Sequence, residues 1–368
     1  MSDLNHFKKK FSKENQFLHL NNAGLSPISL AAKKKICYWA EKFYQEGFFS
    51  DNEYMKEVQH SRESLAKLIG CDSQEIAFFQ STAGAISQLC FQFPLKPYDE
   101  VITWDQEYAS NLYPWRESCR RNGAILKIVK SEDNFTTPVD RIIEQISDKT
   151  KAIAISWLQF TTGSKTDLAK LSEVTNQKNI FLFVDIIQGL GIHSFEMKKL
   201  GIDAVAGGSH KWLCSPVGVG YLAIDQKHIQ KIAPHNFGAY TFGTCDDPTD
   251  LVCQPKSDAL KYEAGSKQVL EITALGASVD LILEASVTTI EAEILRLSSK
   301  LAEGIQSAGY AVYYNNSSIV NFIPKQDTCK RLNEIHCSFA KRGPGVRLSP
   351  HAFNTDKEID QIIKVLRD

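Results

Sequence analysis

Residues 180–188 read Ile-Phe-Leu-Phe-Val-Asp-Ile-Ile-Gln, and residues 204–212 read Ala-Val-Ala-Gly-Gly-Ser-His-Lys-Trp. Each stretch opens with a short apolar run of the kind that forms a buried strand. A charged residue follows each run: Asp185 closes the first, and Lys211 follows the second after two glycines. Because charged side chains are rarely buried without a partner, these two residues are the first candidates for a functional site.

The spacing of such apolar runs along the chain predicts an α/β fold. Most runs are separated by segments with helical periodicity, such as residues 168–177, and strands that alternate with helices form a mainly parallel sheet covered on both faces. Because the pattern changes after about residue 240, we expect a smaller α+β domain at the C-terminal end. The five further apolar runs lie at residues 75–79, 101–104, 124–129, 152–157 and 219–224.

The predicted domain organisation follows from this change of pattern. Ser26-Pro27 reads as a helix start, with serine as the N-cap and proline at the first helical position. Residues 236–258 read as a long loop, and residues 269–308 as a strong helical pattern that links the domains. The three parts are an N-terminal segment over residues 1–25 that contributes to the substrate site, a large cofactor-binding domain over 26–258 and a small domain over 259–368.

The composition argues against several classes of protein. Of the 368 residues, 43% are hydrophobic and 23% are charged, as in ordinary globular domains. The 42 Lys and Arg residues balance the 43 Asp and Glu residues, so no surplus of positive charge predicts a nucleic-acid or anionic membrane partner. No apolar run is long enough to span a bilayer, and the polar N-terminus lacks the hydrophobic segment of a secretory signal. We therefore expect a cytoplasmic protein.

The cysteines give no sign of a metal site or of a disulfide framework. There are nine of them, an odd number, and no two are arranged as Cys-x-x-Cys. A zinc site therefore has no support in the sequence. We expect reduced thiols that lie mostly in cores.

Asp185 and Lys211 together indicate one particular chemistry. Ligands of open α/β sheets bind beyond the carboxyl ends of the strands, which is where both residues are expected. A desolvated lysine has a lowered pKa and can form a Schiff base with a carbonyl group. Pyridoxal phosphate requires such a lysine, together with an acid beside its pyridine nitrogen. Taken singly, the aspartate could cap a helix and the lysine could be a solvated loop residue, but the pair favours pyridoxal phosphate as the cofactor.

The order of the motifs supports this interpretation. Asp-x-x-Gln at residues 185–188, followed by Ser-His-Lys-Trp at residues 209–212, resembles the class V aminotransferase family, in its cysteine desulfurase and isopenicillin-epimerase-like branch. The resemblance extends from residues 20–24 to residues 354–360. It implies a fold-type-I enzyme in which the lysine binds pyridoxal 5'-phosphate and the aspartate is the acid partner of the ring.

A phosphate-binding loop is expected at residues 80–84, Gln-Ser-Thr-Ala-Gly, which follow one predicted strand and open a predicted helix. Backbone N–H groups at a helix start bind phosphate well, although a simple Ser/Thr cap of the helix is the alternative interpretation. The resemblance implies that Thr82 and Ala83 hold the cofactor phosphate. It also implies a phosphate contact from His210, with Ser209 in place of a serine that desulfurases carry three residues before the lysine.

The resemblance further implies contacts to the cofactor ring and to a second subunit. Gln188 should donate a hydrogen bond to the phenolic oxygen of the ring. Residues 261–266 read Lys-Tyr-Glu-Ala-Gly-Ser and are similar to a family motif whose hydroxyl reaches the phosphate of the neighbouring subunit. Ser266 therefore implies a two-fold homodimer with shared active sites.

The substrate carboxylate calls for a bidentate arginine. Residues 345–350 read Gly-Val-Arg-Leu-Ser-Pro and match the C-terminal motif of the family, so Arg347 is the candidate. A plain surface arginine is the alternative. Asn22, in the N-terminal motif, is a candidate for contact with the same carboxylate.

Three departures count against a standard cysteine desulfurase. Desulfurases carry a mobile-loop cysteine that attacks the substrate sulfur, whereas Cys337 alternates with Ile335 as in a strand and is interpreted as a core thiol. Desulfurases also stack a histidine on the cofactor ring, but Ala109 occupies that position, so Tyr108 or another residue must cover the ring. Residues 159–163, Gln-Phe-Thr-Thr-Gly, replace the usual asparagine near the phenolic oxygen.

These residues predict an enzyme, while the reaction itself stays open. Lys211 is expected to hold the cofactor and then to act as the proton-transfer base on a small amino acid. Our first hypothesis is an aminotransferase-like reaction. The close alternative is a C–S lyase or desulfurase-like enzyme that needs no catalytic cysteine, and an epimerase-like role is a further one. A non-catalytic binding module on the same fold is the remote alternative, against which the combination of Lys211, Asp185 and Arg347 argues.

Overall fold

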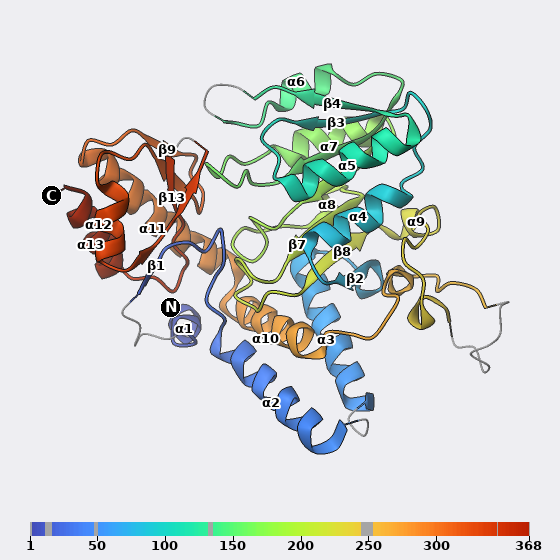
Figure 1. The fold of residues 1–368 in the computed structure, drawn as a ribbon, viewed down its shortest axis with the longest axis horizontal. Helices are drawn as coiled ribbons and strands as arrows, with labels where there is room; N and C mark the ends of the chain where they lie inside the picture. Colours follow the sequence, from blue (N-terminus) through green and yellow to red (C-terminus); the bar gives the residue numbers. More distant parts are fainter. Residues whose placement is uncertain are drawn as a thin grey trace.

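A seven-stranded sheet forms the centre of the molecule (Figure 1). This computed structural model describes residues 2–11, 17–47, 51–131, 135–243, 253–343 and 345–367. The strands of the large sheet are β2 Ile76–Phe79, β3 Glu100–Trp104, β4 Ile125–Val129, β5 Thr150–Ser156, β6 Phe181–Asp185, β7 Ala204–Gly208 and β8 Gly220–Ile224. Their order is β2-β8-β7-β6-β5-β3-β4, and only β8 runs antiparallel to its neighbours. The predicted α/β fold with a mainly parallel sheet is confirmed.

Both faces of this sheet are buried, as the continuous apolar runs predicted. Along β6, Phe181 and Phe183 belong to the core on one face, whereas Leu182 and Val184 belong to the core on the other. This alternation follows from the two-residue period of a strand. Side chains of α4 and α5 build the first core, and those of α6 and α7 contribute to the second. These helices span α4 Thr82–Gln92, α5 Ala109–Asn122, α6 Val139–Glu144 and α7 Leu168–Gln177.

Three long helices lie beside the sheet and correct two predictions. α10 Val269–Ala285 packs against α2 Leu30–Glu46 and α3 Asp51–Ile69. The N-cap of α2 is Ser29, whose hydroxyl oxygen accepts from the N–H of Ala32, so the predicted helix start at Ser26 is three residues early. The predicted helical stretch 269–308 is two helices, because Ser286 takes a left-handed backbone conformation, with φ 67°, before α11 Val287–Ser307.

The C-terminal part has its own sheet and its own core. Four antiparallel strands lie in the order β12-β13-β10-β9, with bounds β9 Val312–Tyr314, β10 Val320–Phe322, β12 Ala340–Arg342 and β13 Gly345–Leu348. Their core includes Val320, Phe322 and Leu348, together with residues of α11, of α12 Thr328–Glu334 and of α13 Asp356–Arg367. The predicted α+β character of this region is confirmed, and the boundary between residues 258 and 259 stays a prediction.

The N-terminal residues are attached to this C-terminal part (Figure 1). β1 Leu18–His19 pairs in parallel with β11 Cys337–Ser338. No pattern in the sequence predicted α1 Ser2–Lys8, whose Phe7 is buried against His351 with ring centroids 5.7 Å apart. The remaining short helices are α8 Met197–Leu200, α9 Gln226–Ile229 and the 3-10 turns Ser73–Glu75, Ala239–Thr241 and Ala259–Tyr262.

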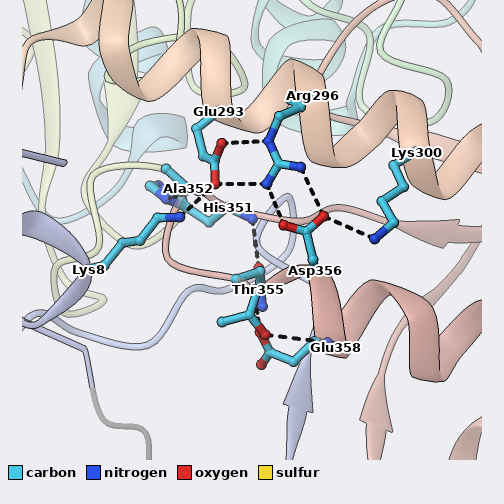
Figure 2. Close-up of polar contacts among 10 residues, drawn as sticks. Lys8, Glu293, Arg296, Lys300, His351, Ala352, Thr355, Asp356 and Glu358 are labelled. Atoms are coloured by element: carbon cyan, nitrogen blue, oxygen red, sulfur yellow. Dashed lines mark hydrogen bonds and ion pairs between the residues drawn. The ribbon is translucent and has the colours of Figure 1, made fainter. Parts of the chain in front are cut away.

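Ion pairs hold these terminal helices together (Figure 2). Lys8 of α1 lies 2.6 Å from the carboxylate of Glu293 in α11. Arg296, one turn further along α11, binds both Glu293 and Asp356, the first residue of α13. Lys300 adds a second contact to Asp356 at 3.0 Å. The pKa of the Asp356 carboxyl lies well below its usual value because of these hydrogen bonds, so the network is intact at neutral pH.

The cysteines follow the predicted pattern in part. Within the described residues, Cys90, Cys119, Cys214 and Cys337 are buried free thiols. Cys253 differs from the expectation, because it is disulfide-bonded. It lies in the predicted loop 236–258, of which residues 244–252 lie outside the described part of the structure. No described helix is both long and apolar enough to cross a membrane.

A buried ion pair fixes the edge of the large sheet to the start of the C-terminal region. The guanidinium of Arg62 in α3 donates two hydrogen bonds to the carboxylate of Glu263, at 2.7 and 3.1 Å. The same carboxylate accepts from the N–H of Phe78 in β2 and pairs with Lys267. Both Arg62 and Glu263 are buried, and Arg62 also donates to the carbonyl of Ile76. Removing one charge would leave the other buried without its partner.

We expect Glu263→Gln to lower the free energy of unfolding by about 3–5 kcal/mol, because Arg62 would keep its buried charge without a carboxylate. Chemical denaturation followed by circular dichroism measures this loss. Glu117→Gln is the control, since Glu117 pairs with Arg120 and Arg121 on the surface, and its removal should barely change stability. Equal small effects of the two substitutions would contradict the structural role of Glu263.

Candidate active site

A cavity of about 270 Å³ lies at the carboxyl ends of the parallel strands. Asp185 is the last residue of β6, and Lys211 follows β7 by three residues. Parallel α/β sheets bind their ligands at this edge. The cavity brings together eight residues that the sequence singled out: Thr82, Ala83, Tyr108, Asp185, Gln188, His210, Lys211 and Arg347.

Asp185 and Lys211 influence each other's charge inside the cavity. Asp185 is buried, and burial raises the pKa of its carboxyl to about 6, although one oxygen accepts from the N–H of Ile187 at 2.9 Å. Burial lowers the pKa of the Lys211 amine to about 8, while the charge of Asp185 opposes this shift. The guanidinium groups of Arg347 and Arg342 lower it further. The result is an amine with a substantial uncharged fraction near neutral pH.

The start of α4 lines the same cavity with Ser81, Thr82 and Ala83, which together are called the cup. Ser81 is the N-cap, and its hydroxyl oxygen accepts from the N–H of Gly84. The hydroxyl of Thr82 is buried and has no partner among the described residues. Gly208 permits this approach, since a Cβ there would lie 2.8 Å from the Thr82 oxygen. An unpartnered buried hydroxyl at a helix N-terminus fits a phosphate group.

Three further predicted residues, His210, Gln188 and Tyr108, line the same cavity. Burial lowers the pKa of His210 to about 4, so its imidazole is neutral at physiological pH and keeps one N–H to donate. The side-chain amide of Gln188 donates to the carbonyl of Ala23 and accepts from the indole of Trp212, which leaves one N–H free. The ring of Tyr108 has its centre 5.7 Å from the Lys211 nitrogen.

Arg347 is held rigidly on β13. Its terminal nitrogens donate to the carbonyl of Phe160 at 2.6 Å and to the side-chain oxygen of Asn21 at 3.2 Å. The side chain is buried, yet its Nε has no partner among the described residues. A buried guanidinium with an unpaired N–H beside a cavity can bind a carboxylate.

Three predicted residues do not line the cavity. The hydroxyl of Ser209 donates to the carbonyl of Pro216, and this contact stabilises the loop that carries Lys211. Asn22 is buried, and its amide bonds to the carbonyl of Ser349 at 2.8 Å; its neighbour Asn21 is the residue that contacts Arg347. Ser266 is exposed on the surface.

Glu107 supports the site and was missed by the sequence analysis. Its buried carboxylate accepts from the indole of Trp104, the amide of Asn111, and both the N–H and the hydroxyl of Ser156. These contacts join the ends of β3 and β5 to the start of α5 and so position Tyr108. Burial raises the pKa of Glu107 to about 7. The available signal was the pair of acidic residues, Asp105 and Glu107, just after an apolar strand.

Several lining residues also escaped prediction, because segments far apart in the sequence bring them together. Arg342, at the end of β12, places a second guanidinium in the cavity. None of the described lining residues is a cysteine. Cys337 is buried in β11 and its pKa is raised to about 12 by burial, so its interpretation as a core thiol is confirmed. The other unpredicted lining residues are Ala23, Gly24, Ser81, Ser110, Phe160 and Ile187.

Comparison with known proteins agrees with this geometry. The family model of aminotransferase class-V matches residues 45–362. A probable cysteine desulfurase of Methanothermobacter thermautotrophicus is 24% identical over 338 residues, which cover 85% of this chain and 84% of the relative. The cysteine desulfurase CsdA of Escherichia coli has a TM-score of 0.88 at 19% identity, over 98% of this chain and 97% of that one. A variant of C-DES with glycine covalently linked to its pyridoxal phosphate has a TM-score of 0.90 at 17% identity, over 98% and 99%.

A desolvated lysine, a buried aspartate and a phosphate cup on this fold define a pyridoxal-phosphate-dependent enzyme. Because the family model covers most of the chain, the protein belongs to the aminotransferase class-V family. Pyridoxal phosphate is its cofactor.

We expect the protein without cofactor to combine with pyridoxal phosphate faster as the pH rises, with a midpoint near 8, because only the uncharged Lys211 amine attacks a carbonyl. Stopped-flow absorbance at a series of pH values measures this rate. In Asp185→Asn the midpoint should fall, since the carboxylate charge that raises the pKa of Lys211 is gone. A midpoint at the ordinary lysine value of 10.5 would contradict the desolvation of Lys211.

Proposed function

We propose that the protein is a pyridoxal-phosphate-dependent C–S lyase that cleaves a small sulfur-containing amino acid by β-elimination. The observation that carries this proposal is the composition of the cavity: one lysine, one aspartate and two arginines, with no cysteine among its described residues. Elimination needs a base at Cα and a leaving group on Cβ, and it needs no protein thiol. Sulfur transfer to a catalytic cysteine, as in desulfurases, needs one.

Lys211 is assigned two tasks. Its side-chain amine would hold the cofactor, and once freed by the substrate amine it would take the proton from Cα. A pKa of about 8 suits both tasks, because the amine is then partly uncharged at working pH. When bound, pyridoxal phosphate supplies an electron sink for the electrons of the broken Cα–H bond. Asp185 is assigned to the protonated pyridine nitrogen, whose positive charge its carboxylate stabilises.

The other cofactor contacts follow from the positions of the lining residues. Thr82, Ala83 and His210 are assigned to the phosphate, and Ser209 acts indirectly by supporting the loop that carries Lys211. Gln188 is assigned to the phenolic oxygen through its free N–H.

Two further proposals concern the cofactor ring and a second subunit. Tyr108 is assigned to cover the cofactor ring. We also infer a homodimer in which the exposed Ser266 reaches the phosphate of the partner site, and a cytoplasmic location; both stay predictions from the sequence.

Two arginines favour a substrate with two carboxylates. Arg347 is assigned to the α-carboxylate, because it lines the cavity and its Nε has no partner among the described residues. Arg342 is exposed and also lines the cavity, so it can bind a second anionic group. Cystine carries two carboxylates and a good sulfur leaving group. C-DES, which shares this fold, is a cystine C–S lyase with cysteine persulfide as its reaction product. We therefore place cystine first among the substrates.

Transamination is the second candidate, as the sequence analysis put it first and the family carries that name. It uses the same lysine, which then moves the proton from Cα to the cofactor carbon. Epimerisation needs only return of the proton to the opposite face. The reaction products distinguish elimination, transamination and epimerisation from one another.

Cofactor-loaded protein given L-cystine and water should release one pyruvate, one ammonia and one cysteine persulfide per cystine. A lactate dehydrogenase assay, an ammonia assay and a cyanide-based persulfide assay measure the three products. Lys211→Ala should reduce turnover by roughly a thousandfold or more, because it lacks the base. A keto acid that retains the sulfur, formed with one equivalent of aminated cofactor, would replace this proposal by transamination.

Arg342→Ala should raise KM for cystine about tenfold with little loss of kcat, because it removes a charge-assisted contact to the second carboxylate. The same substitution should change KM for cysteine, which has one carboxylate, much less. Lys341→Ala is the matched control: this neighbouring cation is also exposed but does not line the Lys211 cavity. Steady-state kinetics on both substrates decide the point, and equal changes for both would refute the role of Arg342.

A further inference from the structure

Lys211 lies at the start of a tight turn whose backbone needs support from outside. The turn ends at Cys214, whose N–H donates to the carbonyl of Lys211 at 3.0 Å. Trp212, Leu213 and Cys214 are buried. Cys214 takes a left-handed backbone conformation, with φ 49°. Such a conformation costs free energy in a residue other than glycine, and it persists only where the surrounding structure holds it.

Two helices hold the far end of this turn. The carbonyl of Cys214 accepts from the N–H of Ser29, the N-cap of α2, at 3.0 Å. It also accepts from the hydroxyl of Ser278 in α10, at 3.0 Å. The carbonyl of Trp212, in the middle of the turn, takes no part in these contacts. Because Trp212 is fully buried, its carbonyl needs a donor from the protein.

His351, four residues after Arg347, supplies this donor. Its Nδ1 lies 2.8 Å from the N–H of Ala352, which can only donate, so the proton of the neutral ring is on Nε2. Nε2 lies 3.2 Å from the carbonyl oxygen of Trp212. Burial lowers the pKa of His351 to about 4, which keeps the ring neutral at physiological pH. The thiol of Cys214 lies 3.7 Å from the same oxygen and is a weaker donor.

The imidazole of His351 is held in one orientation. The side chain is fully buried, and both ring nitrogens have a hydrogen-bond partner. The rings of Phe7 in α1 and of Phe353 stack with it, with centroids 5.7 and 4.8 Å away and interplanar angles of 16° and 10°. The donor to the Trp212 carbonyl is therefore fixed in direction as well as in distance.

Trp212 carries this constraint into the cofactor cavity. Its indole N–H donates to Oε1 of Gln188 at 2.9 Å. Because an indole can only donate, this contact decides which end of the Gln188 amide is the oxygen. The amide nitrogen donates to the carbonyl of Ala23 and keeps its second N–H for a ligand of the cavity that Gln188 lines.

We propose that His351 is a positioning residue of the cofactor site. It holds the turn that carries Lys211 and, through Trp212, the orientation of the Gln188 amide. His351 does not line the cavity, so it acts through these neighbours. The segment that carries Arg347 thereby also fixes residues on the cofactor side of the cavity. This role of His351 rests on the proposed contact between Gln188 and the phenolic oxygen, and it is independent of which reaction the enzyme catalyses.

Two amide variants separate the roles of the two ring nitrogens. His351→Gln places an N–H near the position of Nε2 and keeps the donor to Trp212, whereas the shorter His351→Asn keeps only the acceptor for Ala352. The readout is the pH titration of the absorption band of the bound cofactor. A donor to the phenolic oxygen lowers the midpoint, because it draws charge from that oxygen. We expect the midpoint to rise by about one pH unit in His351→Asn and by less than about 0.3 in His351→Gln.

Phe7→Leu is the control for packing. It removes a ring that stacks on His351 but leaves both hydrogen bonds of the imidazole in place. We expect this variant to unfold at a lower denaturant concentration, with the titration midpoint of the cofactor unchanged. Equal midpoints in His351→Gln and His351→Asn, or a shift in Phe7→Leu as large as that in His351→Asn, would overturn the positioning role.

The route through Gln188 is tested by two further variants. Trp212→Phe removes the indole donor and should raise the midpoint as His351→Asn does. In a Gln188→Leu background, His351→Asn should shift the midpoint by less than about a third of its usual shift, because no amide remains to be oriented. An unchanged midpoint in Trp212→Phe, or fully additive shifts, would overturn this route. None of these titrations uses the C–S lyase reaction, so the two proposals can fail separately.

Discussion

The arrangement of the active site depends on a buried carboxylate and a buried amine that share one edge of the sheet. Burial pushes the pKa of Asp185 up and that of Lys211 down, and each charge partly restores the other. Such groups are costly to bury unless neighbours supply hydrogen bonds. The N–H of Ile187 does so for Asp185. Gly208 brings the lysine loop against Thr82, where a side chain would collide. The cup and the lysine are therefore parts of one packed unit.

Sequence patterns predicted the elements whose cause is local. A strand buried on both faces leaves a continuous apolar run, and β6 and β8 lie where such runs occur. The boundaries were less accurate where two local signals compete. Ser26 and Ser29 are both acceptable N-caps, and only tertiary contacts decide between them: the Ser26 hydroxyl donates to Asn22. The break at Ser286 has no Gly or Pro to announce it. Helical periodicity continues across it, so the sequence predicted one segment.

The lining of the cavity was predictable where one motif supplies both a residue and its neighbours, as for Asp185, Lys211 and Gln188. It was not predictable where the contact joins distant segments. Which of the adjacent residues Asn21 and Asn22 faces Arg347 depends on the pairing of the N-terminal segment with β13, and a shift of one residue reverses the answer. Arg342, at the end of the short strand β12, and Phe160, from a loop, enter the cavity from segments whose course no periodicity describes. Glu107 is defined by four donors from three elements, which become neighbours only in the folded chain.

The contact between Asn21 and Arg347 also has a consequence for the order in which the protein can assemble. The two residues are 326 positions apart, and β1 pairs with β11 over a similar span. On a ribosome that adds about 5–20 residues per second, roughly 16–65 s pass between the synthesis of the two partners. The large sheet can close during this interval, with Asp185 and Lys211 already in place. A growing chain therefore acquires Asp185 and Lys211, the residues proposed to hold the cofactor, before it can form the contact that fixes Arg347, the residue proposed to hold the substrate.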